Sequence, residues 1–245
     1  MSPITALMDR GFSPDIFREQ GALDLRNVGD EAWRVIVASC RAKDLRLYHL
    51  LVGSLSGIEQ LTSTLALEIV WANRLTDIEP VFKMHWLERL SLSDFPNLHS
   101  IDGIESLEGL VELHLSGNLG SLHPPLRLQS VKPISHLSKL EKLELSNIRL
   151  QDRDISLVGS SFPNLRRLRL SNEFEREQFA FLAKKLNAQL ETPIEAYAEL
   201  NASCRECGGP QYLFKGRRMP LLCRNCDHAR FEKYLRAFEQ MVQKS

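Results

Sequence analysis

Four cysteines near the end of the sequence have the type and spacing needed to hold a metal ion. Two residues separate Cys204 from Cys207 and Cys223 from Cys226, and fifteen residues lie between the two pairs. This spacing is typical of a four-cysteine zinc site, because two thiolates of one tight turn can reach the same ion. Four sulfur ligands complete a tetrahedron with no open position, so we expect a structural Zn2+ ion.

Two other uses of these cysteines remain open. Iron accepts the same four thiolates, and a pair of disulfides is the simplest alternative, although a reducing compartment disfavours it. A RING-type ligase would need a second metal site, and the fifth cysteine, Cys40, stands alone. The sequence therefore predicts one metal site, with zinc preferred over iron.

The segment around the cysteines resembles a zinc ribbon. Residues 211–214 and 219–222 are expected to form hairpin strands joined by a turn at 215–218. Asp227 is expected to be the N-cap of a helix, whose apolar residues at helical spacing are Phe231, Tyr234, Leu235, Phe238 and Met241. So short a segment has little core, so metal binding must supply its folding free energy, about 10–16 kcal/mol at comparable sites.

Charge is distributed unevenly along the chain. Lys and Arg number 31, as do Asp and Glu, but residues 201–245 hold nine basic and four acidic residues. Basic residues near a tetrathiolate site offset its negative charge, and they also suit a nucleic acid. Nucleic-acid binding or regulation through this basic ribbon is therefore the alternative function, with Lys215, Arg217 and Arg218 as its candidate residues.

The sequence shows none of the nucleotide-binding or zinc-protease motifs that mark common enzyme classes. The segment from Gly53 to Gly57 is close to a nucleophile elbow, but Leu55 occupies the position of the nucleophile. Cys40 precedes a predicted strand and is expected to be a small buried residue. We therefore predict no catalytic residues and no small-molecule substrate.

The rest of the chain repeats one pattern, in which two residues and then one residue separate three leucines. It is clearest at Leu110, Leu113 and Leu115, which Asn118 follows. The central leucines of seven copies are Leu23, Leu45, Leu65, Leu90, Leu113, Leu143 and Leu168. Over residues 22–190 the sequence resembles the leucine-rich repeat family. Only Asn118 matches the family's asparagine, so other groups must satisfy the remaining turns.

The resemblance implies an α/β solenoid of about seven repeats with a parallel concave sheet. Each Leu-x-Leu turns both leucines to one face of a strand, and stacked neighbours bury that face. Helical returns are expected at 30–37 and, shorter, at 101–107. We expect three parts: 1–21 as an N-terminal helical cap, 22–200 as the solenoid with a cap helix at 175–189, and 201–245 as the ribbon and its helix.

Details of the ends follow the same reasoning. Ser2-Pro3 is expected to open a helical turn that directs Ile4, Leu7 and Met8 inward, and Ser13-Pro14 to open a second. Residues 194–200 are expected to add a last strand. The interval before Leu143 is longer than the others and contains a Pro-bearing insertion at 122–133, which is expected to lie beside the sheet.

The family resemblance implies recognition of another protein on the concave face, including the role of an inhibitor or neutraliser. Residues between and after the paired leucines should face solvent there, and Tyr and Arg are frequent among interface hot spots. The candidate partner-binding residues are Arg46, Tyr48, Glu68, His114, Glu144, Arg167 and Arg169. With no signal peptide and no long apolar stretch, we expect a cytoplasmic location and no membrane contact.

Overall fold

The computed structural model describes residues 3–118, 120 and 124–245, which fall into two compact units. The repeat unit comprises Met1–Arg153 and Ser161–Leu170, and the ribbon unit comprises Asp154–Ser160 and Ser171–Ser245. Among the residues described, no helix has the length and apolar character needed to span a bilayer.

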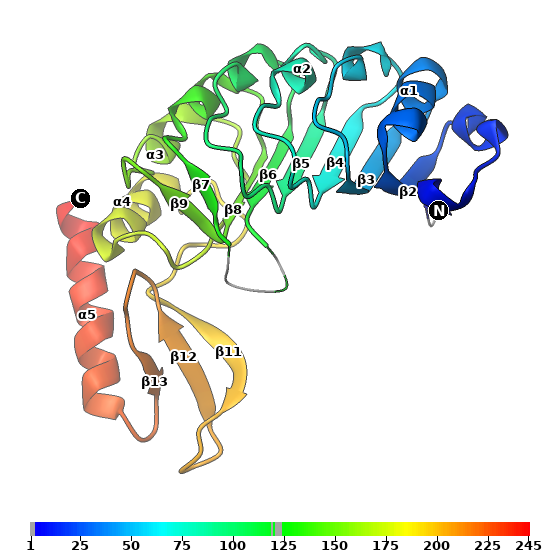
Figure 1. The fold of residues 1–245 in the computed structure, drawn as a ribbon. Helices are drawn as coiled ribbons and strands as arrows, with labels where there is room; N and C mark the ends of the chain where they lie inside the picture. The colour runs from blue at the N-terminus through cyan, green and yellow to red at the C-terminus, as the bar shows by residue number, and fades with distance from the viewer. Residues whose placement is uncertain (1–2, 119, 121–123) are drawn as a thin grey trace. The chain divides into compact units, whose positions relative to one another are not determined.

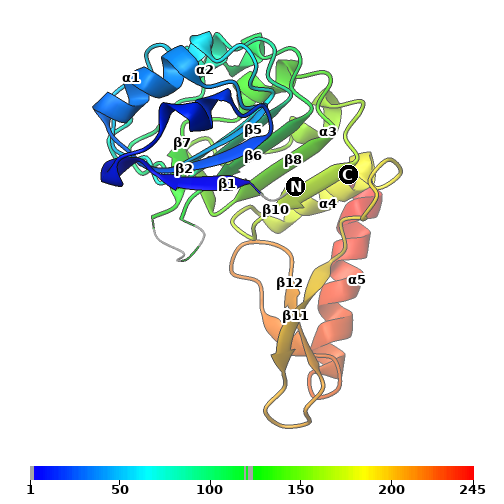
Figure 2. The same ribbon diagram turned by 90° about the vertical axis from the view of Figure 1, so that its right-hand side faces the viewer.

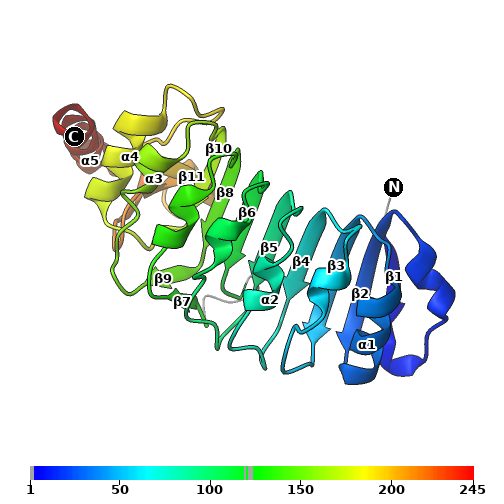
Figure 3. The ribbon, with the colours of Figure 1, turned by 90° about the horizontal axis from the view of Figure 1, so that it is seen from above.

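The repeat unit is built on one parallel sheet of eight strands in the order β1-β2-β3-β4-β5-β6-β8-β10 (Figure 1). The strands are β1 (Ile4–Leu7), β2 (Ala22–Val28), β3 (Asp44–Leu50), β4 (Ala66–Val70), β5 (Arg89–Ser93), β6 (Glu112–Ser116), β8 (Lys142–Ser146) and β10 (Arg167–Leu170). Figure 3 shows them side by side, with short helices along one face. The predicted parallel sheet is therefore confirmed.

Short helices and 3-10 turns (η) cover the outer face of this sheet. They are α1 (Asp30–Ser39), η3 (Ile58–Gln60), α2 (Glu79–Phe82), η4 (Ile104–Ser106) and η5 (Lys132–His136). The helical returns predicted at 30–37 and 101–107 are thus confirmed. Ile36 and Ile104 from the helical side, and Leu47 and Leu92 from the sheet, are fully buried. Since each such side chain contributes about 1.5–3 kcal/mol when buried, this aliphatic layer is the main stabilising element of the unit.

The register of the third predicted repeat is different from the sequence interpretation. Leu67, and not Leu65, pairs with Leu45 on one side and Leu90 on the other. The spacings of the first five central leucines become 22, 22, 23 and 23 residues. Leu65 precedes β4, whose buried pair is Leu67 and Ile69. Leu65-Ala-Leu67 and Leu67-Glu-Ile69 both offer two aliphatic residues separated by one, and burial selects the second.

Backbone groups take over the role of the missing asparagines in the turns. In five repeats, one residue near the end of the strand has a left-handed backbone. These residues are Asn27, His49, Trp71, Asp94 and Asn147. Amides then donate to carbonyls of the next repeat, as from Trp71 to Ser93 and from Asp94 to Ser116. The next residue in each of these repeats is apolar and buried: Val28, Leu50, Ala72, Phe95 and Ile148. The turns are therefore regular.

The predicted helical turn at the N-terminus is wrong. Ile4–Leu7 is a strand that pairs with β2, with Ile4 opposite Leu23, while Ser2 lies outside the described residues. The open edge of β2 offers backbone hydrogen bonds that outweigh a local helical preference. Two 3-10 turns follow, η1 (Met8–Arg10) and η2 (Pro14–Arg18), and the second was predicted at Ser13-Pro14. Met8 and Phe17 are buried.

The insertion predicted at 122–133 is described from residue 124 onward, since 121–123 lie outside the described residues. Leu126–Leu128 forms β7, which pairs in parallel with β9 (Ile148–Leu150) in a separate two-stranded sheet. Leu126, Leu128 and Ile148 are buried. The described part of the insertion therefore extends the core of the repeat unit.

The ribbon unit contains the predicted ribbon and both predicted helices. Its elements are α4 (Arg176–Leu186), the antiparallel strands β11 (Tyr197–Ser203), β12 (Pro210–Phe214) and β13 (Leu221–Cys223), and α5 (His228–Lys244); α3 (Val158–Ser161) lies at its border. Residues 194–200 were expected to add a strand to the solenoid. Instead β11 pairs with β12, with Tyr197 opposite Phe214, because an antiparallel hairpin neighbour is close in sequence.

Figure 2 shows α5 beside the ribbon strands, and an aromatic cluster joins them. The Phe231 ring lies about 5 Å from those of Tyr197, Phe214 and Tyr212, and Phe214 and Phe231 are fully buried. Arg176 on α4 donates a hydrogen bond to the Tyr234 carbonyl. This unit is thus held by a few rings and by ties between α4, the ribbon and α5.

Candidate metal centre and concave face

The four predicted cysteines meet at one end of the ribbon sheet. All four Sγ atoms lie within 4.8 Å of one another, with 3.4 Å between Cys207 and Cys223 and 3.9 Å between Cys204 and Cys226. Zinc–sulfur bonds of about 2.3 Å in a tetrahedron place sulfurs about 3.8 Å apart, whereas a disulfide needs about 2.05 Å. The cysteines are free, and the cluster could hold a metal ion.

Two glycines shape the first cysteine turn. Gly208 has a left-handed backbone and donates to the Cys204 carbonyl at 2.9 Å, and Gly209 N–H donates to Cys207 Sγ at 3.4 Å. A Cβ on Gly209 would lie 2.9 Å from Asn225 Nδ2. The turn therefore lets the Gly209 amide approach a cysteine sulfur directly.

The cysteines influence one another's protonation. The Gly209 N–H that reaches Cys207, together with the thiols of Cys223 and Cys226, lowers the pKa of Cys207. Hydrogen bonding with Cys207 and Cys204 raises the pKa of Cys226 to about 12. Four thiolates repel one another at these distances, and a divalent cation relieves that repulsion by replacing the protons.

Asp227 stabilises the second cysteine turn rather than the helix. Its Oδ2 accepts a hydrogen bond from Cys223 N–H at 3.1 Å, and its own N–H donates to the Cys223 carbonyl. Asp227 stands at the N-cap position of α5, as predicted from the sequence. Its side chain, however, forms no capping hydrogen bond with the helix. His228 is exposed as the first residue of α5.

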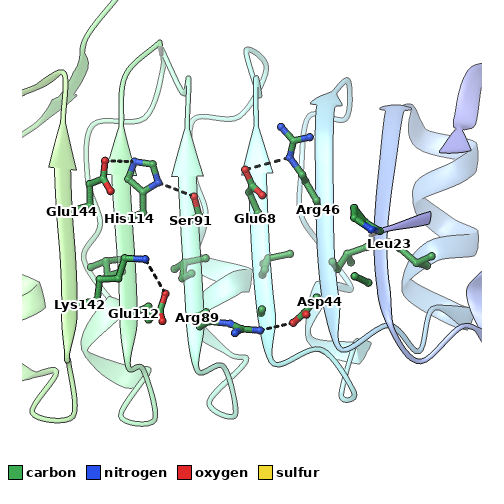
Figure 4. Close-up of a pocket in the computed structure, with 17 residues that line it drawn as sticks. Leu23, Asp44, Arg46, Glu68, Arg89, Ser91, Glu112, His114, Lys142 and Glu144 are labelled. Atoms are coloured by element: carbon green, nitrogen blue, oxygen red, sulfur yellow. Dashed lines mark hydrogen bonds and ion pairs between the residues drawn. The ribbon is translucent and has the colours of Figure 1, made fainter. Parts of the chain in front are cut away.

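The inner, concave face of the repeat sheet carries two rows of polar side chains that line a groove of about 350 Å³ (Figure 4). The first row, at the start of each strand, contains Asp44, Ala66, Arg89, Glu112 and Lys142. The second row lies between the paired leucines and contains Arg46, Glu68, Ser91, His114 and Glu144. Strand alternation places both rows on one face.

The second row includes four of the predicted partner-binding residues: Arg46, Glu68, His114 and Glu144. Arg46 Nε lies 3.2 Å from Glu68 Oε1, a pairing that the corrected register of β4 makes possible. His114 lies 3.7 Å from Glu144. Burial lowers the pKa of His114, and the Glu144 charge opposes that effect. These side chains form a continuous polar row over rigid strands.

Sequence reasoning found only Arg167 at a first-row position, beside Lys142 in register, and missed the rest of that row. Arg89 reaches across the small Ala66 to Asp44, with 2.6 Å between nitrogen and oxygen, and Lys142 lies 3.3 Å from Glu112. The signal was present, because the residue before each Leu-x-Leu faces the same side as the residue between the leucines. Apart from Arg167, the candidate residues of the sequence analysis lie between or after the leucines.

Ser91, His114 and Glu144 contain the residue types of a nucleophilic triad. Ser91 Oγ lies 3.2 Å from His114 Nδ1, and Glu144 lies beyond the other ring nitrogen (Figure 4). Ser91, however, is in the middle of β5, which is paired with β4 and β6 on both sides. The amides of such a strand are used by the ladder and cannot stabilise an oxyanion beside the serine.

The other three predicted partner-binding residues, Tyr48, Arg167 and Arg169, do not line the groove. Tyr48 is outside the groove, with Arg46 Cζ 5.3 Å from its ring centroid. Arg169 pairs with Glu144 at 3.5 Å, and exposed Arg167 lies beside Lys142 in register.

In the ribbon unit, the residues of the nucleic-acid alternative lie in the turn between β12 and β13. Arg217 lies 3.9 Å from Glu175, and Lys215 Nζ lies 6.0 Å from the Phe179 ring. Arg218 is exposed.

Comparison with solved structures supports the fold of the repeat unit. An internalin (inlF) from Listeria monocytogenes matches with a TM-score of 0.52 and 17% identity over 71% of this chain and 48% of its own. The chain thus spans about half the length of that internalin. At this identity the likeness shows the fold alone: a leucine-rich repeat solenoid, as the sequence resemblance predicted.

Two further structures match with lower scores. Internalin C2 (inlC2) from Listeria monocytogenes has a TM-score of 0.42 at 16% identity, over 64% of this chain and 74% of its own. A leucine-rich repeat protein from Leptospira interrogans has a TM-score of 0.28 at 18% identity, over 66% and 51%. No protein-family model matches the sequence, and the search of curated proteins finds no relative.

Proposed function

We propose that the chain is a non-catalytic protein-interaction module that binds a partner protein on the concave face of its repeat unit. The observation that carries this proposal is the groove, in which two rows of mostly charged side chains cross five adjacent strands. The strands fix the spacing of these groups, so little conformational entropy is lost on binding. An inhibitor or neutraliser would use the same face.

The chemistry of the groove supports binding rather than catalysis. Its charges are paired with neighbours on the sheet, and such half-exposed pairs contribute at most about 1 kcal/mol each. A partner can exchange them for its own charges at small cost. The row from Ser91 to Glu144 lacks a nearby oxyanion site, which is why we assign it a role in recognition.

A matched pair of charge reversals tests this function. Glu112→Arg changes the groove, and Glu108→Arg makes the same change on the exposed return after η4. The full chain is used to capture proteins from the native cell, followed by quantitative mass spectrometry. We expect at least one protein to be retained by wild type and Glu108→Arg and lost with Glu112→Arg. Equal capture by all three chains would contradict the proposal.

We propose that the ribbon holds one structural Zn2+ ion through Cys204, Cys207, Cys223 and Cys226. The sulfur separations and the absence of an open coordination position support this assignment. When bound, the metal would tie the two cysteine turns together, with Gly209 and Asp227 orienting the ligands. A cytoplasmic location, where thiols stay reduced, is part of the same proposal. Elemental analysis should give about one zinc per chain, and iron in its place would overturn the choice of metal.

Nucleic-acid binding through Lys215, Arg217 and Arg218 is the second candidate, favoured by the excess of basic residues in 201–245. The ribbon's rings, which could stack on bases, instead pack against Phe231. Binding of an oligonucleotide should weaken linearly with salt on a log–log scale, and reversal of Arg217 and Arg218 should flatten the slope. If no oligonucleotide binds at low salt, this candidate is eliminated.

A further inference from the structure

Beside one end of the groove, five residues of β2, β3 and the turn after β4 form an aromatic–arginine cluster. Its members are Arg26, Arg46, Tyr48, His49 and Trp71. Tyr48 is bracketed by two guanidinium groups, with Arg26 Cζ at 5.4 Å and Arg46 Cζ at 5.3 Å from its ring centroid. Trp71 lies edge-on to Tyr48 and stacks on His49 with 3.8 Å between centroids. Because Arg46 also lines the groove, the cluster and the groove form one continuous surface.

A buried carboxylate holds the two arginines in place. Asp24 is only 3% exposed, and its Oδ2 accepts from Arg26 Nε and Nη2 and from Arg46 Nη1, at 2.7–3.1 Å. His49 and Trp71 are fixed by their left-handed turns, and His49 Nδ1 lies 2.7 Å from Asn27 Oδ1. The cluster is therefore ordered before any partner arrives, which lowers the entropy cost of binding.

Hydrogen-bond donors exceed available acceptors in this cluster. Each guanidinium carries five N–H donors, and the contacts with Asp24 and Glu68 use only part of them. In the part of the chain that the structure describes, no residue accepts from the Tyr48 hydroxyl or the Trp71 indole N–H. The Arg26 and Arg46 side chains remain 40% and 33% exposed, whereas that of Asp24 is 4% exposed. Glu68, which pairs with Arg46, is 42% exposed, so what the accessible surface presents is guanidinium N–H donors beside flat aromatic rings.

We infer that this cluster is the anchor of the concave face and that it takes an acidic side chain of the partner protein next to an apolar one. The carboxylate would accept the unused N–H groups of Arg26 and Arg46 and the Tyr48 hydroxyl, since charge-assisted bonds of this kind are the strongest. The adjacent apolar side chain would lie on Trp71. Trp, Tyr and Arg are the residue types most enriched in interface hot spots. This inference rests on the proposed function and names the chemistry of its partner.

A random peptide library displayed on phage, selected on the full chain, tests the inference. The affinity of each selected peptide is then measured for three variants of the chain. Trp71→Asn removes the indole but suits the turn, because Asn27 and Asn147 occupy the corresponding positions with the same backbone. Arg26→Gln removes one charge of the cluster, and Arg149→Gln removes one exposed charge of β9 as the matched control. Thermal melting confirms that each variant is folded.

We expect the selected peptides to be enriched in Asp or Glu beside an apolar residue. Their affinity should fall at least about tenfold with Trp71→Asn and with Arg26→Gln, and stay within about twofold with Arg149→Gln. Peptides without acidic enrichment, or no selected peptides, would overturn the inference. Peptides whose affinity falls with the groove variant Glu112→Arg but not with Trp71→Asn would overturn it and leave the concave-face function standing. Peptides that depend on neither site would count against both.

Discussion

The repeat unit and the ribbon unit use different means to stay folded. In the repeat unit, fully buried aliphatic side chains such as Leu47, Ile69 and Leu92 recur on each strand from β2 to β8. In the ribbon unit, one aromatic cluster packs the three-stranded sheet against α5, and four cysteines lie together at the end of that sheet. Stability is therefore distributed over many equivalent positions in the first unit and concentrated at a few in the second.

This difference also separates the roles of polar groups. In the repeat unit the charged pairs of the groove lie on the concave face, where they are about half exposed. In the ribbon unit polar groups hold elements together, as Arg176 does for α4 and α5 and Asp227 does for the second cysteine turn. A change of charge should thus affect binding in the first unit and folding in the second.

The largest effect is expected from loss of a cysteine ligand. Cys223→Ser should unfold the ribbon and α5, because metal binding at such sites supplies about 10–16 kcal/mol. Hydrogen exchange should rise in residues 197–245 and stay slow in the repeat strands, and zinc content should fall. Cys40→Ala, which removes a buried thiol of the repeat unit, should retain the zinc. A metal-free chain with a protected ribbon would contradict the contrast between the units.

A smaller loss of stability, confined to the other unit, is expected from a substitution in the repeat core. Leu92 is fully buried in β5, at the centre of the sheet. Leu92→Ala should lower the free energy of unfolding of the repeat unit by about 2–5 kcal/mol through lost burial and a cavity. Leu7→Ala, at a leucine that is 39% exposed, serves as the control and should cost far less. Denaturant unfolding measures both, and loss of zinc in Leu92→Ala would show that the units are not independent.

A glycine of the ribbon turn tests how tightly that unit is tied together. Gly216 has φ +117°, and a Cβ there would lie 2.8 Å from Arg176 Cβ and 3.0 Å from its Cα. Gly216→Ala should destabilise the ribbon unit by about 1–3 kcal/mol, from backbone strain and the clash. Gly11 also has a positive φ but has no atom within 4 Å of a Cβ, so Gly11→Ala isolates the strain. Equal shifts of the melting temperature in the two variants would mean that the contact with Arg176 adds nothing to the backbone strain.

The features that the sequence predicted well are those set by local chemistry. Alternation in Leu-x-Leu specifies which side of a strand is buried, and the cysteine spacing allows the four sulfurs to approach one ion. The choice between Leu65 and Leu67 could not be made locally, because Leu65, Leu67 and Ile69 alternate without a break and either neighbouring pair could face the core. Pairing with Leu45 and Leu90 decides it.

The strand at Ile4–Leu7 and the partner of β11 depend on tertiary hydrogen bonding. Residues 4–7 form a strand because the edge of β2 pairs with them, and that edge cannot be recognised from their own sequence. Trp71 and His49 were missed for a related reason. His49 near the end of β3 and Trp71 just after β4 lie outside the Leu-x-Leu frame, and only the stacking of neighbouring repeats brings their ring centroids to 3.8 Å.

The smallest effect is expected from an ion pair of the concave face. Arg89 and Asp44 lie 2.6 Å apart, but each side chain is about half exposed, so solvent weakens their attraction. Arg89→Gln should change the free energy of unfolding of the repeat unit by less than about 1 kcal/mol, and added salt should reduce even that difference. Denaturant unfolding at low and high salt measures it. A loss above about 2 kcal/mol would mean that the charged rows stabilise the sheet, and a partner could then not exchange these pairs at small cost.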